Sequence, residues 1–176
     1  MTEKTSPHKV SRMLELYFQG YSQSDIAEKI NVNQSTVSLH INRFKTMAAL
    51  IDRLWCKTEV GGVARYENDH YQQISQDIAN VPGNPWFICT MWVAQYHIAR
   101  AQSIGDLKPA LQIFTWAKHC ALPSGVVAEQ VHPYNCAPLN VSPLTWSHAA
   151  VVIAIHEYID KYHELQAQLH HRQKGI

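Results

Sequence analysis

Cysteine and histidine are the residue types whose chemistry is easiest to read from spacing, because metal sites use short repeats of them. The chain has 11 histidines and 4 cysteines among its 176 residues. No C-x-x-C pair, no H-x-x-x-H spacing and no mixed Cys/His spacing recurs. We therefore expect no metal site and no cofactor. The cysteines are scattered, and we interpret all of them as reduced thiols: Cys56, Cys89, Cys120 and Cys136.

The composition is that of a folded protein, with 46% hydrophobic residues, 16% charged residues and a net charge of +1. These values argue against a disordered tail and against a membrane protein, and they indicate no particular partner. Residues 1–9 are polar and lack the apolar core of a signal peptide, and no apolar run approaches the roughly 20 residues of a membrane span. We expect a cytoplasmic protein without a membrane partner.

The elements that must position any functional side chains are helices. Residues 8–17 carry apolar side chains at i, i+3, i+4 and i+7, and Gly20 follows where a helix C-cap would lie. Ser22, with Asp25 three residues later, predicts the start of a second helix, and Asn33 predicts the start of a third. These signals together predict a compact trihelical unit.

Beyond it, residues 46–56 predict either a connecting helix or an extension of the third helix. Glycines at 61 and 62 and the sequence VPGNP at 81–85 predict loops, and a proline-rich loop is expected at 122–143. Helical spacing recurs at 86–101, 107–121 and 147–169, and no strand pattern is evident. We expect an all-α fold with a trihelical domain at 1–50, a second domain at 51–165 and a polar tail at 166–176.

The segment YSQSDIAEKINVNQSTVSLHINRFK resembles the helix-turn-helix of prokaryotic DNA-binding regulators, and the resemblance covers residues 8–46. In such a unit a small residue, here Ala27, lets two helices approach closely. Val37, Ile41 and Phe44 would anchor the recognition helix so that its N-terminal side chains enter a major groove. The resemblance implies that DNA is a partner.

The outward side of that helix carries polar side chains that could contact DNA. We expect Gln34 to read a base, and we expect phosphate contacts from Ser35, Ser38, Arg43 and Lys45. Leu39 and Asn42 face outward with them. Through residue 50 there are six Lys or Arg against four Asp or Glu, so affinity would be weak without a dimer. The alternative is a trihelical bundle that docks other proteins.

Four ordered motifs follow: GGVARYENDHY, PGNPWFICTMWVAQYHIA, SGVVAEQVHP and SPLTWSHAAVVIAIHEY. They resemble the late motifs of family-15 glycoside hydrolases, the glucoamylase type, over residues 53–162. The resemblance implies an α/α-barrel of helical hairpins that hydrolyses α-glucosides with inversion of configuration at the anomeric carbon. It implies that Glu129 is the general base, that Arg65 binds sugar hydroxyls, and that Trp86 and Trp146 line the sugar site. Tyr66 and Asp69 are further candidates.

This residue set suits sugar recognition, because a sugar ring offers apolar C–H faces to Trp and hydroxyls to Arg or carboxylate. The residues by themselves also allow simpler interpretations. Trp86 and Trp146 could be core aromatics, Arg65 could pair with Glu67 or Asp69, and Glu129 could be a solvated loop carboxylate.

The chain departs from the family pattern at its N-terminal side, where a helix-turn-helix stands in place of the hairpins that carry the family's general acid. We expect a partial α/α-barrel whose exposed apolar helix faces need a homo-oligomer or a partner chain. The resulting hypothesis is a DNA-binding protein with an incomplete glucoamylase-like segment, inactive alone. The alternatives are a component or truncated form of a glucan 1,4-α-glucosidase-type enzyme with Glu129 as base, or a fused or truncated reading frame.

Overall fold

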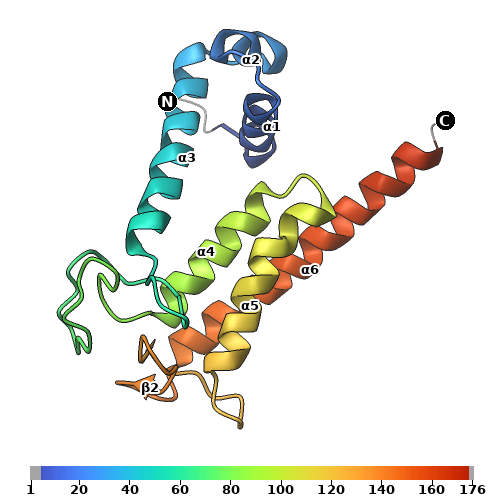
Figure 1. Cartoon of the computed structure of the whole chain (residues 1–176). Coiled ribbons are helices and arrows are strands. Elements are labelled where there is room, and N and C mark those ends of the chain that lie inside the picture. The colour runs from blue at the N-terminus through green and yellow to red at the C-terminus, as the bar shows by residue number, and fades with distance from the viewer. Residues whose placement is uncertain (1–4, 175–176) are drawn as a thin grey trace. The chain divides into compact units, whose positions relative to one another are not determined.

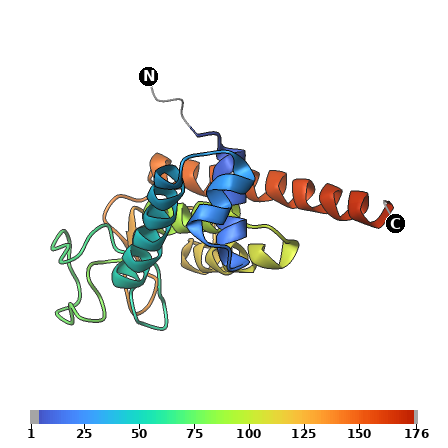
Figure 2. The same cartoon turned by 90° about the horizontal axis from the view of Figure 1, so that it is seen from above.

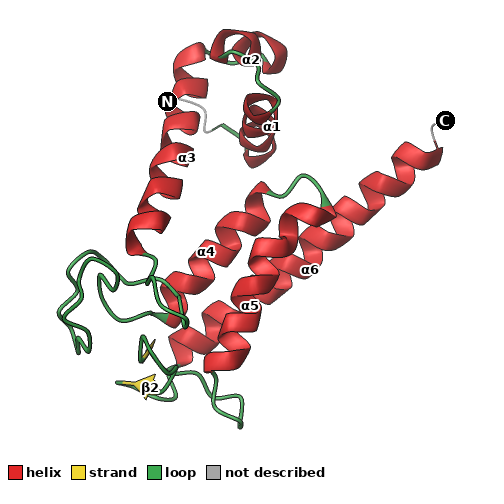
Figure 3. Ribbon diagram, in the orientation of Figure 1, coloured by secondary structure: helices red, strands yellow, loops and turns green. Residues whose placement is uncertain are grey.

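The structure, a computed structural model, describes residues 5–174, apart from the side chains at positions 7, 8, 11, 15, 18, 44 and 171–174. The elements in chain order are α1 (Pro7–Phe18), α2 (Gln23–Ile30), α3 (Gln34–Leu54), α4 (Phe87–Arg100), the 3₁₀ turn η1 (Ile104–Leu107), α5 (Lys108–Cys120), β1 (Gln130–Val131), β2 (Pro138–Leu139) and α6 (Thr145–Lys174). The expected all-α fold is confirmed, as Figure 3 shows. None of the helices in the described part of the chain is long and apolar enough to cross a membrane.

The chain forms two compact units, Met1–Leu50 and Ile51–Ile176. The helix α3 begins in the first unit and ends in the second. The stretch at 46–56 is therefore an extension of the third helix, up to Leu54, and not a separate connecting helix.

The first unit is held together by a small apolar core whose members come from α1, α2 and α3: Met13, Leu16, Ile26, Ala27, Val37 and Ile41. The N-terminus of α2 is fixed by a capping box, in which Ser22 and Asp25 each bond the other's backbone N–H. Asn31 ends α2 in the left-handed region at φ 52° and turns the chain toward α3. The inward positions expected for Val37 and Ile41 are confirmed, and that expected for Phe44 falls outside the described side chains.

In the second unit α4 packs against both α6 and α5, and Figure 1 shows the three helices. Phe87 and Met91 of α4 are fully buried, and the ring of Phe87 lies 5.0 Å from that of Trp116 on α5. The last turns of α6 project past the other two helices, which Figure 2 shows from above. Leu165 is the last buried described side chain of α6, and the helix continues to Lys174 through the segment predicted to be a polar tail.

Residues 55–86, between α3 and α4, contain no helix or named strand. Two isolated bridges lie within this loop region, Trp55 with Val63 and Ala64 with Pro85, and a third joins it to β1, Trp86 with Gln130. Gly62 is required here. Its φ is +89°, and a Cβ atom would lie 2.8 Å from Pro85 Cβ and 2.8 Å from the Trp116 ring.

One feature of this unit was not predicted, and one sequence-based expectation is wrong. The loop at 122–143 contains an antiparallel two-stranded sheet, β1 with β2, whose strands of two residues are too short for an alternating pattern to reveal. Cys120 and Cys136 form a disulfide with a Cα–Cα distance of 4.9 Å, so they are not reduced thiols. Spacing rules did not reveal this pair because the chain folds back over a separation of 16 residues. Cys56 and Cys89 are free and buried.

Candidate functional site

Arg65 and Asp69 form the most buried ion pair of the site. The guanidinium donates from Nε to one carboxylate oxygen at 3.0 Å and from Nη2 to the other at 2.9 Å. The Asp69 side chain is 1% exposed and that of Arg65 is 36% exposed. The backbone N–H of Tyr71 also donates to this carboxylate at 3.1 Å. The hydrogen bond to Asp69 raises the pKa of Arg65, so the guanidinium is a permanent cation held by a buried anion.

Three aromatic rings surround the same guanidinium. The Cζ atom of Arg65 lies 4.8 Å from the ring centroid of Tyr66, 5.3 Å from that of Tyr71 and 4.5 Å from that of Trp86. Nη2 also donates to the Tyr66 hydroxyl at 3.1 Å, whereas Nη1 has no hydrogen-bond partner among the described residues. The arrangement therefore leaves a free donor beside aromatic faces.

Glu129 lies directly before β1, and its backbone is held on both sides. Its N–H donates to the carbonyl of Val141 at 2.9 Å, and its carbonyl accepts from the N–H of Phe87 at 3.2 Å. Its half-buried carboxylate accepts from Nδ2 of Asn140, in a short contact, and from Nε2 of Gln130 at 3.3 Å. The carboxylate is thus oriented by two amides and remains partly open to solvent.

Tyr71 and Asn140 connect the two halves of the site. Nδ2 of Asn140 donates to the Tyr71 hydroxyl at 2.8 Å as well as to Glu129. The ring of Tyr71 faces Arg65 and lies 6.3 Å from that of Trp86. We call the five residues Arg65, Tyr71, Trp86, Glu129 and Asn140 the Arg65–Glu129 cluster. Sequence reasoning missed Tyr71 and Asn140, because each lies in a loop without periodicity.

Two buried amide side chains, those of Asn84 and Gln130, help to orient the carboxylate of Glu129. The side chain of Gln130 is fully buried, and its Oε1 accepts from Nδ2 of Asn84 at 2.9 Å. Asn84 also donates to the carbonyl of Gln72 at 2.7 Å and accepts from the N–H of Ile74 at 3.2 Å. With its oxygen engaged by Asn84, the Gln130 amide presents its nitrogen to Glu129.

The structure brings together Arg65, Tyr66, Asp69 and Trp86, which the sequence singled out, and links them to Glu129 through Tyr71 and Asn140. The ion pair of Arg65 is with Asp69, since Glu67 pairs with Arg53 instead. Trp86 is 5% exposed, and Nε1 of its indole has no hydrogen-bond partner among the residues that the structure describes.

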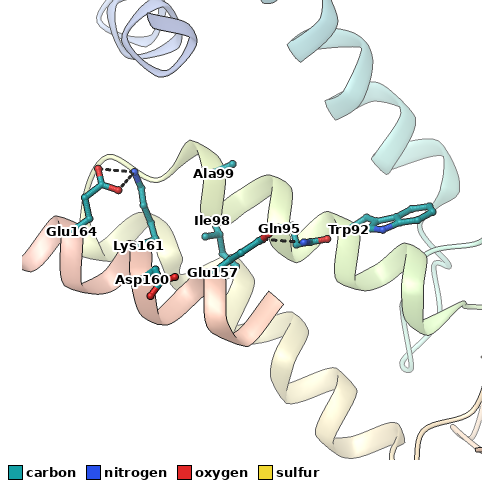
Figure 4. Close-up of a pocket in the computed structure, with 8 residues that line it drawn as sticks. All are labelled: Trp92, Gln95, Ile98, Ala99, Glu157, Asp160, Lys161 and Glu164. Atoms are coloured by element: carbon teal, nitrogen blue, oxygen red, sulfur yellow. Dashed lines mark hydrogen bonds and ion pairs between the residues drawn. The ribbon is translucent and has the colours of Figure 1, made fainter. Parts of the chain in front are cut away.

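Trp146 lies elsewhere, at the start of α6. Its side chain is 59% exposed, so it is not a core aromatic, and it meets Trp92 of α4 edge to face at 6.4 Å. A groove of about 590 Å³ between α4 and α6 begins at Trp92 (Figure 4). Its lining is Trp92, Gln95, Ile98, Ala99, Glu157, Asp160, Lys161 and Glu164. Gln95 donates to Glu157 at 3.0 Å across this groove, and Lys161 pairs with Glu164.

In the first unit, the side chains that the sequence assigned to DNA contact share the outer side of α3. Gln34, Ser35, Asn42, Arg43 and Lys45 are exposed, and Ser38 is half-buried. Leu39 is 49% exposed on the same side, whereas Val37 and Ile41 are fully buried.

Contacts among these residues are few. Asn42 donates to Ser38 at 3.4 Å, and Lys45 Nζ lies 5.5 Å from the Tyr17 ring. Partial burial, and then the charge of Arg43, lower the pKa of His40, which disfavours the charged form of this imidazole.

Comparison with protein families gives two matches. The model described as "Glycosyl hydrolases family 15" matches residues 32–156, and the model described as "Putative ATPase subunit of terminase (gpP-like)" matches residues 11–49. No curated protein and no solved structure gives a match. The expected resemblance to family-15 glycoside hydrolases is confirmed. The match begins at residue 32, earlier than the expected 53, so both family matches include the first half of α3.

Proposed function

The chain belongs to the family-15 glycosyl hydrolases, and on this premise we propose that its second unit binds the end of an α-glucoside at the Arg65–Glu129 cluster without hydrolysing it alone. The observation that carries the proposal is the continuous set of contacts from Arg65 through Tyr71 and Asn140 to the carboxylate of Glu129. These residues come from two segments of the chain, the loop at 55–86 and the hairpin of β1 and β2.

Each member of the cluster has a role that sugar chemistry needs. The free Nη1 of Arg65 donates to a hydroxyl, the exposed ring of Tyr71 offers a face to sugar C–H groups, and the buried ring of Trp86 packs against the guanidinium. The Glu129 carboxylate accepts from a hydroxyl or from the water that a hydrolase would activate. Two amide donors keep this carboxylate oriented.

Hydrolysis with inversion requires a second carboxyl group, about 6.5–9.5 Å from the base, that protonates the leaving oxygen. The other carboxylate at the described cluster is that of Asp69, which is buried and held by both nitrogens of the Arg65 fork. Both oxygens of this carboxylate already accept hydrogen bonds from Arg65, so the carboxyl group is not placed to protonate a leaving oxygen. We therefore expect sugar binding by the chain alone, and turnover only if another chain supplies an acid.

The experiment is titration of the purified chain with maltose and maltotriose by calorimetry, followed by an assay for released glucose. Wild-type protein should bind without releasing glucose, and Glu129→Gln and Asn140→Ala should weaken binding. Glu157→Gln, which removes a charge from the α4–α6 groove, is the matched control and should bind like wild type. Equal binding by Glu129→Gln and wild type would refute the site, and glucose release that depends on Glu129 would make the chain a complete enzyme.

For the first unit we propose DNA binding through the outer side of α3. The supporting observation is the burial of Val37 and Ile41, which leaves a row of polar side chains exposed on the other side of α3. As in a helix-turn-helix, α3 follows a shorter, capped helix, α2. The match to a model named for a terminase subunit lies over the same residues.

Retention on a randomised DNA pool at low salt tests this function. Arg43→Ala should weaken retention of all sequences, because it removes a phosphate contact, whereas Gln34→Ala should change which sequences are selected. Lys29→Ala, which removes one positive charge from α2, is the control for a general charge effect. Absence of retention at low salt would eliminate the DNA-binding proposal and favour a protein-docking role.

We also propose that another copy or a partner chain covers the exposed apolar side chains of the second unit. They include Trp92, Trp146, Val152, Ile153 and Ile159, each 42–59% exposed. Light scattering across a concentration series should show a species larger than 20.1 kDa. We place the protein in the cytoplasm, consistent with its DNA-binding unit.

A further inference from the structure

The hairpin that carries Glu129 and Asn140 has little regular structure of its own. Glu129 directly precedes β1 and Asn140 directly follows β2, and the strands pair only as Gln130 with Leu139 and Val131 with Pro138. A hairpin this short is marginally stable in isolation. Its order must therefore come from what it is attached to.

The end of the hairpin near Glu129 is attached by backbone hydrogen bonds. Val131 donates to the carbonyl of Pro85 at 2.9 Å, and Phe87 donates to that of Glu129 at 3.2 Å. The turn at 132–137 is attached differently, by the Cys120–Cys136 disulfide and by a 2.6 Å hydrogen bond between the hydroxyls of Ser75 and Tyr134.

Cys120 is the last residue of α5, a helix that packs into the core through Trp116. Its side chain is 4% exposed and that of Cys136 is 8% exposed. The disulfide thus joins the hairpin turn to the end of a core helix, over a closed loop of 16 residues that contains Glu129. Its formation removes conformations in which the hairpin separates from α5.

The other two thiols are unsuited to compete for this bond. Burial raises the pKa of Cys56 to about 12 and that of Cys89 to about 11, so both are protonated near neutral pH and are weak nucleophiles. Cys56 also donates its proton to the carbonyl of Gly83 at 3.2 Å. What distinguishes Cys120 and Cys136 is proximity, since their Cα atoms lie 4.9 Å apart and their sulfurs are bonded.

We propose that Cys120 and Cys136 are a reversible oxidation site that controls the order of the Glu129 hairpin. In the reducing cytoplasm, where we place the protein, disulfides are usually transient and redox-sensing. The oxidant is a small-molecule disulfide such as oxidised glutathione. One protein thiolate attacks it and expels one thiol, and the second protein thiolate then displaces the other thiol. Two protein thiols become one disulfide, and one glutathione disulfide becomes two glutathione thiols.

This inference concerns the hairpin and does not depend on sugar binding, whereas its effect on ligand affinity rests on the proposed function. Closing the bond holds Glu129 and Asn140 beside Tyr71, which is the arrangement seen in the Arg65–Glu129 cluster. Opening the bond leaves the turn attached by the Ser75–Tyr134 hydrogen bond. Affinity for an α-glucoside should therefore be higher in the oxidised protein.

The test is hydrogen exchange of the full chain after equilibration with either reduced or oxidised glutathione, with thiols counted by alkylation and mass spectrometry. Oxidation should remove two alkylatable thiols, map to Cys120 and Cys136, and slow exchange at 127–141 by about tenfold. Exchange in α4 should not change and serves as the internal reference for folding. The Cys120→Ser/Cys136→Ser variant should exchange like reduced wild type under both conditions.

Three results would overturn the redox site: no bond formed with excess glutathione disulfide, a different cysteine pairing, or equal exchange at 127–141 in both states. If the variant does not fold, reduced wild type alone provides the comparison. A maltose titration of both redox states is run in parallel. Redox-dependent exchange without any maltose binding would contradict the sugar-binding proposal and leave the redox site standing.

Discussion

Arg65 donates two hydrogen bonds, of 3.0 Å and 2.9 Å, to the carboxylate of Asp69, a buried residue. The pair lies at the base of the Arg65–Glu129 cluster and holds the guanidinium against three aromatic rings. A charge buried in this way is costly once its partner is removed.

Arg65→Ala should therefore lower the free energy of unfolding by about 3 kcal/mol, because it leaves the Asp69 carboxylate buried without a counter-charge. Urea unfolding followed by circular dichroism measures this change. The double variant Arg65→Ala/Asp69→Ala should regain part of the loss. Strict additivity of the two single variants would contradict a direct interaction between the residues.

Arg53 and Glu67 provide the matched surface pair. Their side chains are 62% and 43% exposed, so solvent screens the attraction. Glu67→Ala should lower the free energy of unfolding by no more than about 0.5 kcal/mol. A loss as large as that for Arg65→Ala would indicate that burial is not what distinguishes the two pairs.

Tyr71→Phe tests the role of the hydroxyl that joins the two halves of the cluster separately from that of the ring. The variant keeps an aromatic face beside Arg65 but removes the acceptor of the 2.8 Å hydrogen bond from Asn140. Maltose affinity should fall about fivefold, corresponding to one lost hydrogen bond, with little change in unfolding. Tyr66→Phe removes a hydroxyl bonded to Arg65 and should have a smaller effect, since Tyr66 has no link to Glu129.

Ser22→Ala should lower the stability of the first unit by about 1 kcal/mol, because it removes the oxygen that accepts the Asp25 N–H at the start of α2. Amide hydrogen exchange in residues 10–45, measured as the chain is heated, reports the stability of the first unit. Ser24→Ala, inside the same helix, removes a hydroxyl without a capping role and should be neutral. An equal effect of both substitutions would rule out capping as the cause.

Stability should also depend on His97. In the folded protein, burial and then the charge of Arg100 lower the pKa of His97 below its ordinary value of 6.5. The unfolded chain therefore binds a proton that the folded chain resists, and the free energy of unfolding should decrease as the pH falls below about 6.5. His97→Gln should flatten this decrease between pH 7 and pH 5 in a urea series. An unchanged slope would assign the pH dependence to other groups.

The helices of this protein were predictable because their signals are local. The capping box of Ser22 and Asp25, the apolar spacing of Val37 and Ile41 and the prolines of the loop at 122–143 each act within a few residues. The end of α3 was not predictable in the same way. Its extension to Leu54 follows from packing of the last turns against a core that forms only in the folded chain.

The sequence by itself determined the all-α class, the polar outer side of α3 and the candidacy of Arg65, Trp86 and Glu129, since these depend on residue type and short spacing. Only the tertiary structure decided the contact of Asn140 with Tyr71, 69 residues away, the pairing of Cys120 with Cys136, and the position of Trp146 beside Trp92. The physical reason is that loop paths are set by buried hydrogen bonds and glycine-dependent close packing between distant segments. Such contacts leave no period in the sequence.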